Sequence, residues 1–472
     1  MGREHDYEYA PLPTGPDAQY LYEQPVQRKK CRHLAAKLLL VLAAGSVASW
    51  AAYKHCTELR VIVQRYEHQA AVRVSAPVIS LSEDALVDGY DRGKLIECFP
   101  GDDDDDDDDA RRAGGRIRIP LPPITLDSDA VYFFDYPTTH KPRRDDEPKQ
   151  PIPTPPKTTI PRWKTGGTFQ LEVSDSVDKV TVLSSIAFED VLFARVCTFE
   201  RESGAKGVGV IVPEELPEVD KYNLVRFRVK VPAQDIGSFE SNLWNYTQTG
   251  GDLSDALFQN LALVGVGGDL RFESVAAHIA NISTIGGNIT GSYAAHDRFT
   301  IATVGGTVDI DLDFKSTDPE RPAQLALSSA GGPLNATVSL GTTSEDFAGV
   351  FRVVASTTAP LNLVLKEAPA GSSVSLLAST VGGAASVTLP AAYEGSFEAR
   401  TFGLKNQAEL LARDGLKDPA GRGRKRTISS HTIGIPFGHG VSGEVYWGDE
   451  RPERPAGNVR FEAIAAPLTL TV

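Results

Sequence analysis

The 472-residue sequence predicts a mainly β fold, a solenoid-like stack of 19-residue β-strand units, preceded by one transmembrane helix and disordered linkers. Three observations predict it. Apolar and polar residues alternate through much of the chain after residue 163, as in half-buried strands. A Gly-Gly pair recurs there at a fixed spacing, and one long apolar stretch lies near the N-terminus. A β-sandwich with glycine-rich hairpin turns is the alternative fold.

Residues 1–33 are predicted to form a disordered cytosolic tail, because they are polar and contain several prolines and tyrosines. The tail contains the run Tyr9-Ala-Pro-Leu12, which has the Tyr-x-x-apolar form of an endocytic sorting signal. Tyr9 and Leu12 are therefore the candidate sorting-signal residues.

Residues 34–53 are predicted to cross a lipid bilayer as one helix. A helix of this length extends about 30 Å, which matches the hydrocarbon core of a bilayer. Basic residues gather just before the stretch, at positions 28, 29, 30 and 32, and fewer follow it. The positive-inside rule then predicts a single-pass type II protein of the plasma membrane or secretory pathway, with its N-terminus cytosolic and its C-terminus extracellular.

Two polar segments follow the predicted helix. Residues 54–136 are expected to be a membrane-proximal segment, in which the tract Asp102–Asp109 supplies −8 of the formal net charge of −14. Such a tract is typical of a solvated, self-repelling spacer. Residues 137–162 contain eight prolines, which predicts an extended stalk.

Residues 163–472 are predicted to form a β-rich extracellular domain. Alternation is clear at Phe169, Leu171 and Val173, and it recurs in the runs 225–231, 308–314 and 468–472. Only residues 405–413 resemble a helix, and residues 421–426 are expected to be a basic surface loop.

The glycine pairs are the most specific repeat signal. They lie 19 residues apart, at Gly267-Gly268, Gly286-Gly287 and Gly305-Gly306, and apolar residues flank each pair. Stacked units would align these positions, so the glycines are predicted to supply a corner with positive φ in each unit.

Cysteines and glycosylation sequons agree with an extracellular domain. Cys56 and Cys98 could form a disulfide in an oxidising compartment, whereas Cys197 lies in an apolar run and is expected in the core. Four Asn-x-Ser/Thr sequons follow the predicted membrane helix, and we expect N-glycosylation at these asparagines: Asn245, Asn281, Asn288 and Asn335.

The sequence predicts no catalytic residue, no cofactor site and no metal site, and its acidity argues against a nucleic-acid partner. Asp309, Asp311 and Asp313 are expected to share one strand face. Such a row could bind a cation or act on a glycosidic bond, but it is more often the solvated side of a half-buried strand.

The run ISTIGGNITGSY, followed by FTIATVGGTVDIDL, resembles the adhesin-like repeat of bacterial and fungal surface proteins. The final residues, from GVSGEVYWGDERPERPAGNVRFEAIAAPLTL onward, are similar to the ectodomain ends of fungal, mainly basidiomycete, single-pass membrane proteins. The resemblance covers about residues 165–472. It implies a β-repeat ectodomain and transfers no catalytic residue.

The sequence therefore predicts a non-enzymatic cell-surface protein with a glycosylated, adhesin-like ectodomain that binds cell-wall polysaccharide or other surface proteins. Two alternatives remain. A carbohydrate-active β-helix enzyme would need carboxylates on consecutive units, but positions 269, 288 and 307 hold Asp, Asn and Thr. A surface receptor would signal through the tyrosine-rich tail.

Overall fold

The structure is a computed structural model, and it describes residues 93–99, 117–137, 165–188, 194–212, 223–403, 407–435, 438–450 and 456–472. The chain divides into two compact units, residues 1–90 and 91–472, and every described residue belongs to the second. The described residues form 26 strands and no helix, so the mainly β prediction is confirmed. No helix among them is long and apolar enough to span a membrane. The predicted membrane helix, residues 34–53, lies outside the described residues.

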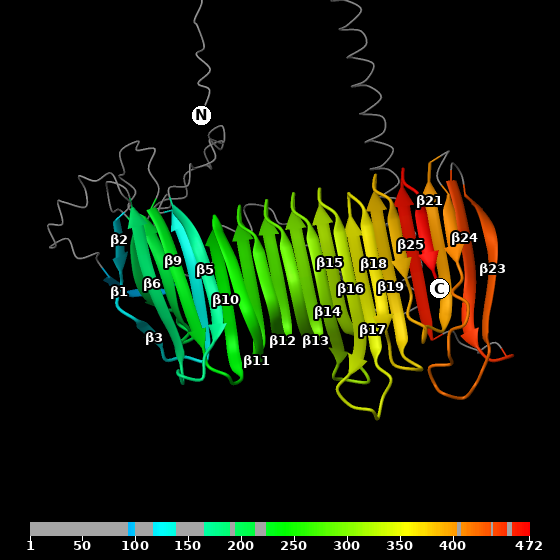
Figure 1. The fold of residues 1–472 in the computed structure, drawn as a ribbon, viewed down its shortest axis with the longest axis horizontal. Coiled ribbons are helices and arrows are strands. Elements are labelled where there is room, and N and C mark those ends of the chain that lie inside the picture. The colour runs from blue at the N-terminus through cyan, green and yellow to red at the C-terminus, as the bar shows by residue number, and fades with distance from the viewer. Residues whose placement is uncertain are drawn as a thin grey trace, which may run out of the picture. The chain divides into compact units, whose positions relative to one another are not determined.

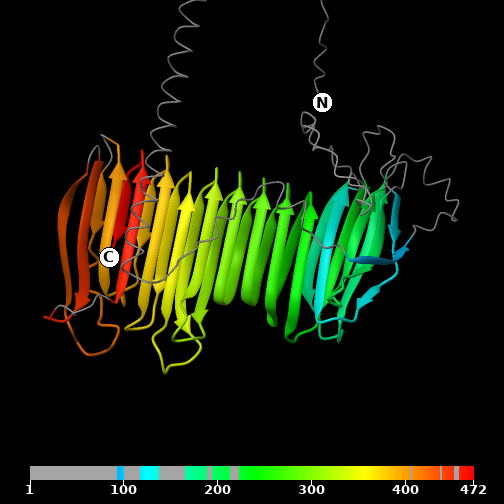
Figure 2. The ribbon, with the colours of Figure 1, turned by 180° about the vertical axis from the view of Figure 1, so that it is seen from behind.

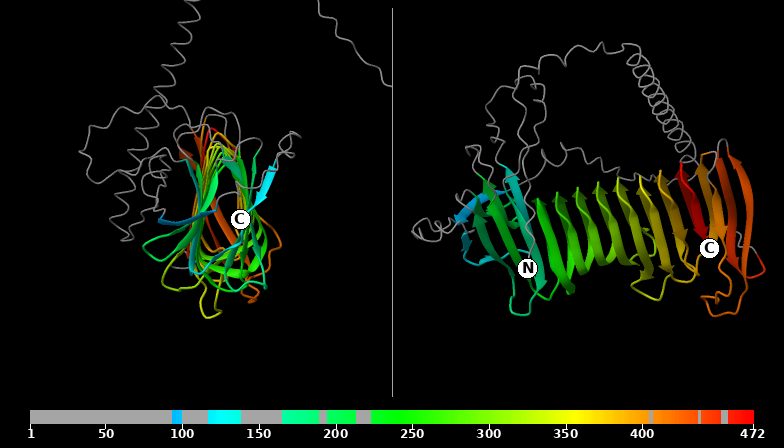
Figure 3. Two further views of the ribbon diagram at one scale, coloured as in Figure 1. Left: turned by 90° about the vertical axis from the view of Figure 1, so that its left-hand side faces the viewer. Right: turned by 45° about the horizontal axis from the view of Figure 1, so that its top comes forward.

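The strands form one continuous sheet that folds into two facing layers (Figures 1 and 3). Layer 1 contains, in spatial order, β6 (Val180–Phe188), β9 (Asn223–Val231), β5 (Thr165–Val173), the first parts of β11 (Tyr246–Val266), β12 (Leu270–Ile285) and β13 (Ile289–Val304), then β14 (Val308–Ser316), β16 (Leu334–Thr342), β18 (Leu361–Glu367), β20 (Ala385–Thr388), β26 (Leu468–Thr471) and β22 (Ala408–Leu411). Two short strands pair with β6 at one end of this layer: β2 (Ile117–Pro120) and β3 (Ile124–Leu126).

Layer 2 faces layer 1 across the core, and Figure 2 shows the stack from the side opposite to Figure 1. It contains β1 (Lys94–Phe99), β7 (Arg195–Glu200), β8 (Lys206–Val212), β4 (Ala130–Pro137), β10 (Ile236–Trp244), the second parts of β11, β12 and β13, then β15 (Ala323–Ala330), β17 (Val350–Thr357), β19 (Ser373–Val381), β25 (Gly457–Ile464), β21 (Gly395–Phe402), β24 (Gly438–Trp447) and β23 (Arg426–Ile435). One strand segment from each layer makes a unit that we call a rung.

Neighbouring rungs pair in parallel, and in the middle of the stack they keep the 19-residue register. Leu270 pairs with Ile289, which pairs with Val308, and all three are buried between the layers. Because the strands are parallel and in register, inward positions such as this one form apolar columns along the stack. Aromatic side chains join the layers near β4 and β5, where the rings of Phe133 and Phe169 meet edge to face at 5.0 Å.

Each glycine pair lies where layer 2 ends and the next rung begins. The first glycines, Gly267, Gly286 and Gly305, have φ of 76°, 77° and 80°. The second glycine has a different role. A Cβ on Gly306 would lie 1.7 Å from the carbonyl oxygen of Gly287, so a side chain there would block the close approach of one corner to the next.

Buried hydroxyl groups hold the corners in place. From β12 to β19 they occupy one inward position per rung at the end of layer 2, and each donates a hydrogen bond to a carbonyl oxygen of a neighbouring corner. Thr303 donates to Gly287 at 3.0 Å, and Thr357 donates to Gly332 at 2.9 Å. These bonds satisfy carbonyl groups that the turn would otherwise leave buried without partners.

Both ends of the stack contain a rung that is out of chain order. The rung of β4 and β5 lies between the rung of β8 and β9 and the strands β10 and β11. At the other end, β25 and β26 lie between β19 and β20 on one side and β21 and β22 on the other. Figure 1 shows β25 in red beside the orange and yellow strands.

These pairings correct the predicted domain boundaries. The β domain was expected to start at residue 163, but β1 to β4 precede that residue and belong to the same sheet. The proline-rich segment therefore connects β4 of layer 2 to β5 of layer 1 in the chain. Most of it, residues 138–162, and the tract Asp102–Asp109 lie outside the described residues.

Two further predictions are wrong. Cys98 forms a disulfide with Cys197, not with Cys56, because β1 and β7 are antiparallel neighbours that place the two cysteines opposite each other. The segment expected to be helical contains β22, which pairs with β26 from Ala408 and Leu468 onward. Pairing with an inserted rung outweighs the helix propensity of this short segment.

Candidate binding surface on layer 1

The outer face of layer 1 displays rows of polar side chains. The parallel register aligns one residue of each strand with its neighbours, so the rows run along the stack. One row includes seven neighbouring strands, from β11 to β20: Thr249, Arg271, Thr290, Asp309, Asn335, Asn362 and Ser386. A second row contains Ser292, Asp311 and Thr337.

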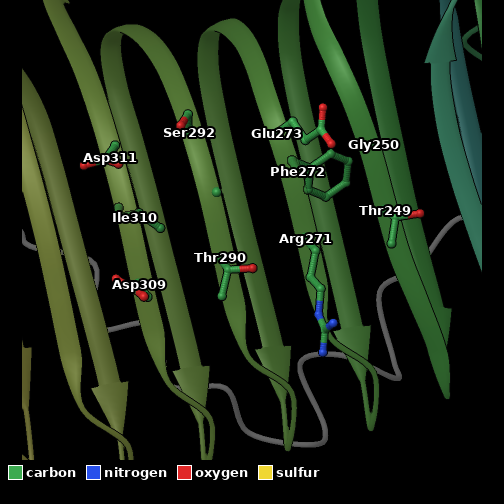
Figure 4. Close-up of a pocket in the computed structure, with 11 residues that line it drawn as sticks. Thr249, Gly250, Arg271, Phe272, Glu273, Thr290, Ser292, Asp309, Ile310 and Asp311 are labelled. Carbon is green, nitrogen blue, oxygen red and sulfur yellow. The ribbon is translucent and has the colours of Figure 1, made fainter.

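The rows border a hollow of about 630 Å³ over β11 to β14. Figure 4 shows Thr249, Thr290 and Asp309 along one row, with Ser292 and Asp311 along the next. Phe272 of β12 pairs with a glycine in each neighbouring strand, Gly250 of β11 and Gly291 of β13. A Cβ on Gly250 would lie 2.5 Å from the Phe272 ring. The aromatic ring therefore fills the space beside a neighbouring strand that has no side chain there.

The three aspartates of β14 share the outer face. Asp309 and Asp311 line the first hollow, and Asp311 and Asp313 line a second hollow of about 490 Å³ that also contains Lys366. Lys315 forms an ion pair with Asp313 at 3.0 Å. Both hollows thus combine carboxylate, hydroxyl and basic groups.

A ladder of hydrogen-bonded polar side chains lies at the edge of this surface, next to the glycine corners. The backbone and side-chain amides of Asn288 donate to Oδ1 of Asp269, at 2.8 and 3.2 Å. Thr307 in turn donates to Oδ1 of Asn288 from its backbone and its hydroxyl, both at 2.9 Å. The backbone N–H of Asn288, together with Arg271, lowers the pKa of Asp269. The positions 269, 288 and 307 are therefore used for structure.

The four predicted glycosylation asparagines have different environments. Asn281 is exposed on layer 2, and Asn335 is exposed on layer 1 beside Asp309. Asn288 is half-buried and its side-chain amide is bonded within the ladder. Asn245 occupies a corner at φ 58°, the position that glycine fills in the repeats. Tyr9 and Leu12 lie outside the described residues.

The structure brings together two histidines that the sequence analysis did not single out. Nδ1 of His278 and Nδ1 of His296 are 3.2 Å apart on β12 and β13. Burial, then the neighbouring His278 and Lys315, lower the pKa of His296. A separation of 18 residues, one less than the repeat, was the signal in the sequence. In the described part of the chain, no three or more His, Cys, Asp or Glu side chains gather as metal ligands.

A buried carboxyl group was also missed. Asp135 on β4 is 4% exposed, and the hydroxyl of Thr165 on β5 donates to its Oδ2 at 2.9 Å. Burial raises the pKa of Asp135 to about 7, although Thr165 and Tyr246 oppose the shift. Because the group is buried between the layers, we expect it to affect the stability of the fold.

No protein-family model matches the chain, and no curated protein matches it. A match among the solved structures is the crystal structure of "a putative cell adhesion protein" from Clostridium sporogenes, at 7% sequence identity and a TM-score of 0.15. The match covers 76% of this chain and 99% of that chain. At this TM-score, the likeness carries no argument about this chain.

Proposed function

We propose that the protein is a non-enzymatic cell-surface protein whose β domain binds a polymer through the outer face of layer 1. The single observation that carries this proposal is the in-register row from Thr249 to Ser386. Strands repeat every 4.7–4.9 Å or so along the stack, so the row offers hydrogen-bonding groups at regular intervals. A polysaccharide of the cell wall presents hydroxyl groups at regular intervals too, and it is the proposed ligand.

The fold itself belongs to this proposal. We interpret the two layers as a β-solenoid and not as a sandwich of hairpins. Parallel pairing at a 19-residue offset supports this interpretation, because a sandwich built from hairpins is antiparallel.

Cosedimentation with insoluble wall polysaccharides tests the ligand. The double variant T249A/S292A removes two hydroxyl groups that line the hollow, one on β11 and one on β13, and we expect binding to weaken about tenfold because two hydrogen bonds are lost. The matched control is T300A, which removes an outward hydroxyl from the layer 2 part of β13. Equal binding by all three proteins would contradict the use of layer 1.

The localisation and membrane topology of the protein are a separate part of the proposal. We place the β domain outside the cell, on a type II membrane anchor formed by residues 34–53, with an N-linked glycan at Asn281, which is exposed on layer 2 away from the row. The Cys98–Cys197 disulfide supports an oxidising compartment. Treatment of carbonate-washed membranes with peptide:N-glycosidase F should increase the mobility of the protein. An unshifted protein that the carbonate wash removes would overturn this topology.

A further inference from the structure

The C-terminal end of the stack contains two arginines with unpaired buried nitrogens. Arg426 is the first residue of β23, and it pairs across the ladder with Trp447 of β24. Its guanidinium lies over the Trp447 ring, 5.9 Å from the centroid. Arg413 belongs to the connection between β22 and β23. The sequence analysis expected Arg426 in an exposed basic loop, whereas its guanidinium is buried.

The nitrogens without hydrogen-bond partners can be named individually. Nε, Nη1 and Nη2 of Arg426 are buried, and none has a hydrogen-bond partner among the residues that the structure describes. Nε of Arg413 is in the same state within that part of the chain, although its Nη2 donates to the carbonyl oxygen of Leu389. Buried donors without partners are rare in proteins, and leaving one unpaired costs about 1–3 kcal/mol, more for a charged group.

Within the described part of the chain, neither Arg413 nor Arg426 forms a salt bridge. Arg413 and Arg426 are close enough to repel each other, and burial lowers the pKa of both, that of Arg426 to about 10. The neighbouring carboxylates are engaged by a third arginine. Arg424 binds Asp418 at 2.9 Å and Glu394 at 3.4 Å. The site therefore combines two neighbouring cations whose buried nitrogens have no acceptor among the residues that the structure describes.

We propose that Arg413 and Arg426 bind one small oxyanion, a phosphate, sulfate or carboxylate group, at the C-terminal end of the stack. The planar guanidinium fork matches two oxygens of such a group, and two forks can hold a single anion together. Because the nitrogens are buried, the anion is a small ion or the end of a flexible chain, not the middle of a polymer. This site is independent of the surface on layer 1.

Calorimetric titration of the full-length protein tests the site, with inorganic phosphate, sulfate and acetate as separate probes in chloride buffer of constant ionic strength. We expect saturable binding of one equivalent by at least one probe, and a midpoint of thermal unfolding that rises with its concentration. The three probes distinguish a tetrahedral oxyanion from a carboxylate. Absence of saturable binding by the wild-type protein would overturn the proposal and needs no variant.

Three variants locate the binding. R426Q should lose tenfold or more in affinity, and R426K, which keeps the charge without the fork, should also bind more weakly. The matched control is R422Q, because Arg422 is an exposed arginine of the same connection. R426Q should fold, since it removes a buried charge that has no partner among the described residues. If R422Q lost as much affinity as R426Q, binding would be general attraction to a basic loop, and the proposal would be wrong.

Discussion

Asp135 shows how one residue makes the stability of the stack depend on pH. Its carboxyl group is buried between β4 and β5, and burial raises its pKa from 3.8 to about 7. The folded state then binds a proton that the unfolded state releases above pH 4. Its contribution to the free energy of unfolding is therefore complete below pH 3.8, and it is lost as the pH rises through 7.

Substitution of Asp135 by Asn should remove this dependence. One pKa unit corresponds to about 1.4 kcal/mol of free energy. As the pH rises from 4 to 8, the free energy of unfolding of the variant should therefore increase by up to about 4 kcal/mol relative to that of wild type. Denaturant unfolding at several pH values measures the difference. D175N, at an exposed turn, is the control and should follow wild type. A constant difference between D135N and wild type across this range would contradict the raised pKa.

At the scale of the element, the rung is the unit of the fold. Its corner uses one glycine for positive φ and a second for close approach, and its hydroxyl group bonds a neighbouring corner. Each rung contacts mainly the rungs on either side of it, as the strand pairings show. In such an array, stability is close to a sum of rung and interface contributions.

Deletion of one whole repeat, residues 270–288, should therefore leave a folded protein. The deletion joins Asp269 to Ile289, so that Asp269 takes the place of Asn288 before β13. The midpoint of cooperative thermal unfolding should fall only modestly. Circular dichroism and calorimetry measure the outcome. Deletion of half a repeat, residues 270–278, is the control and should prevent folding because inward and outward positions no longer match. Unfolding of both variants alike would argue against independent rungs.

The sequence predicts individual rungs better than their connections. The alternation of apolar residues and the glycine pairs at 267, 286 and 305 are local signals, and each arises from a contact that repeats every 19 residues. Cys98 pairs with Cys197 from 99 residues away, and such a contact has no local pattern. The buried Asp135 and the pair of His278 and His296 depend on side-chain placement between rungs, so sequence spacing alone did not reveal them.

At the scale of the whole molecule, the end of the described chain lies inside the stack. β25 and β26 fill the gap between β19/β20 and β21/β22, so the final strands join two parts that precede them. The antiparallel hairpin of β23 and β24 attaches to β21 beyond them. The C-terminal cap therefore depends on the last 16 residues, 457–472.

Truncation after residue 456 should release this cap selectively. Hydrogen exchange should become fast in residues 395–447 and stay slow in β12 to β16, because distant rungs keep their neighbours. A synthetic peptide of residues 457–472 should restore protection, and a scrambled peptide of the same composition should not. Unchanged exchange in residues 395–447 would show that the cap holds without the inserted rung.

The two out-of-order rungs also determine where the molecule can change in length. Since each end is closed by strands from elsewhere in the chain, an added repeat cannot simply extend either tip. It fits only in the middle, between β11 and β19, where consecutive rungs follow chain order. Each duplicated unit would lengthen the outer rows by about 5 Å and leave both caps intact. Gene duplication could thus adjust the reach of this surface in whole steps, without a new fold and without new ends.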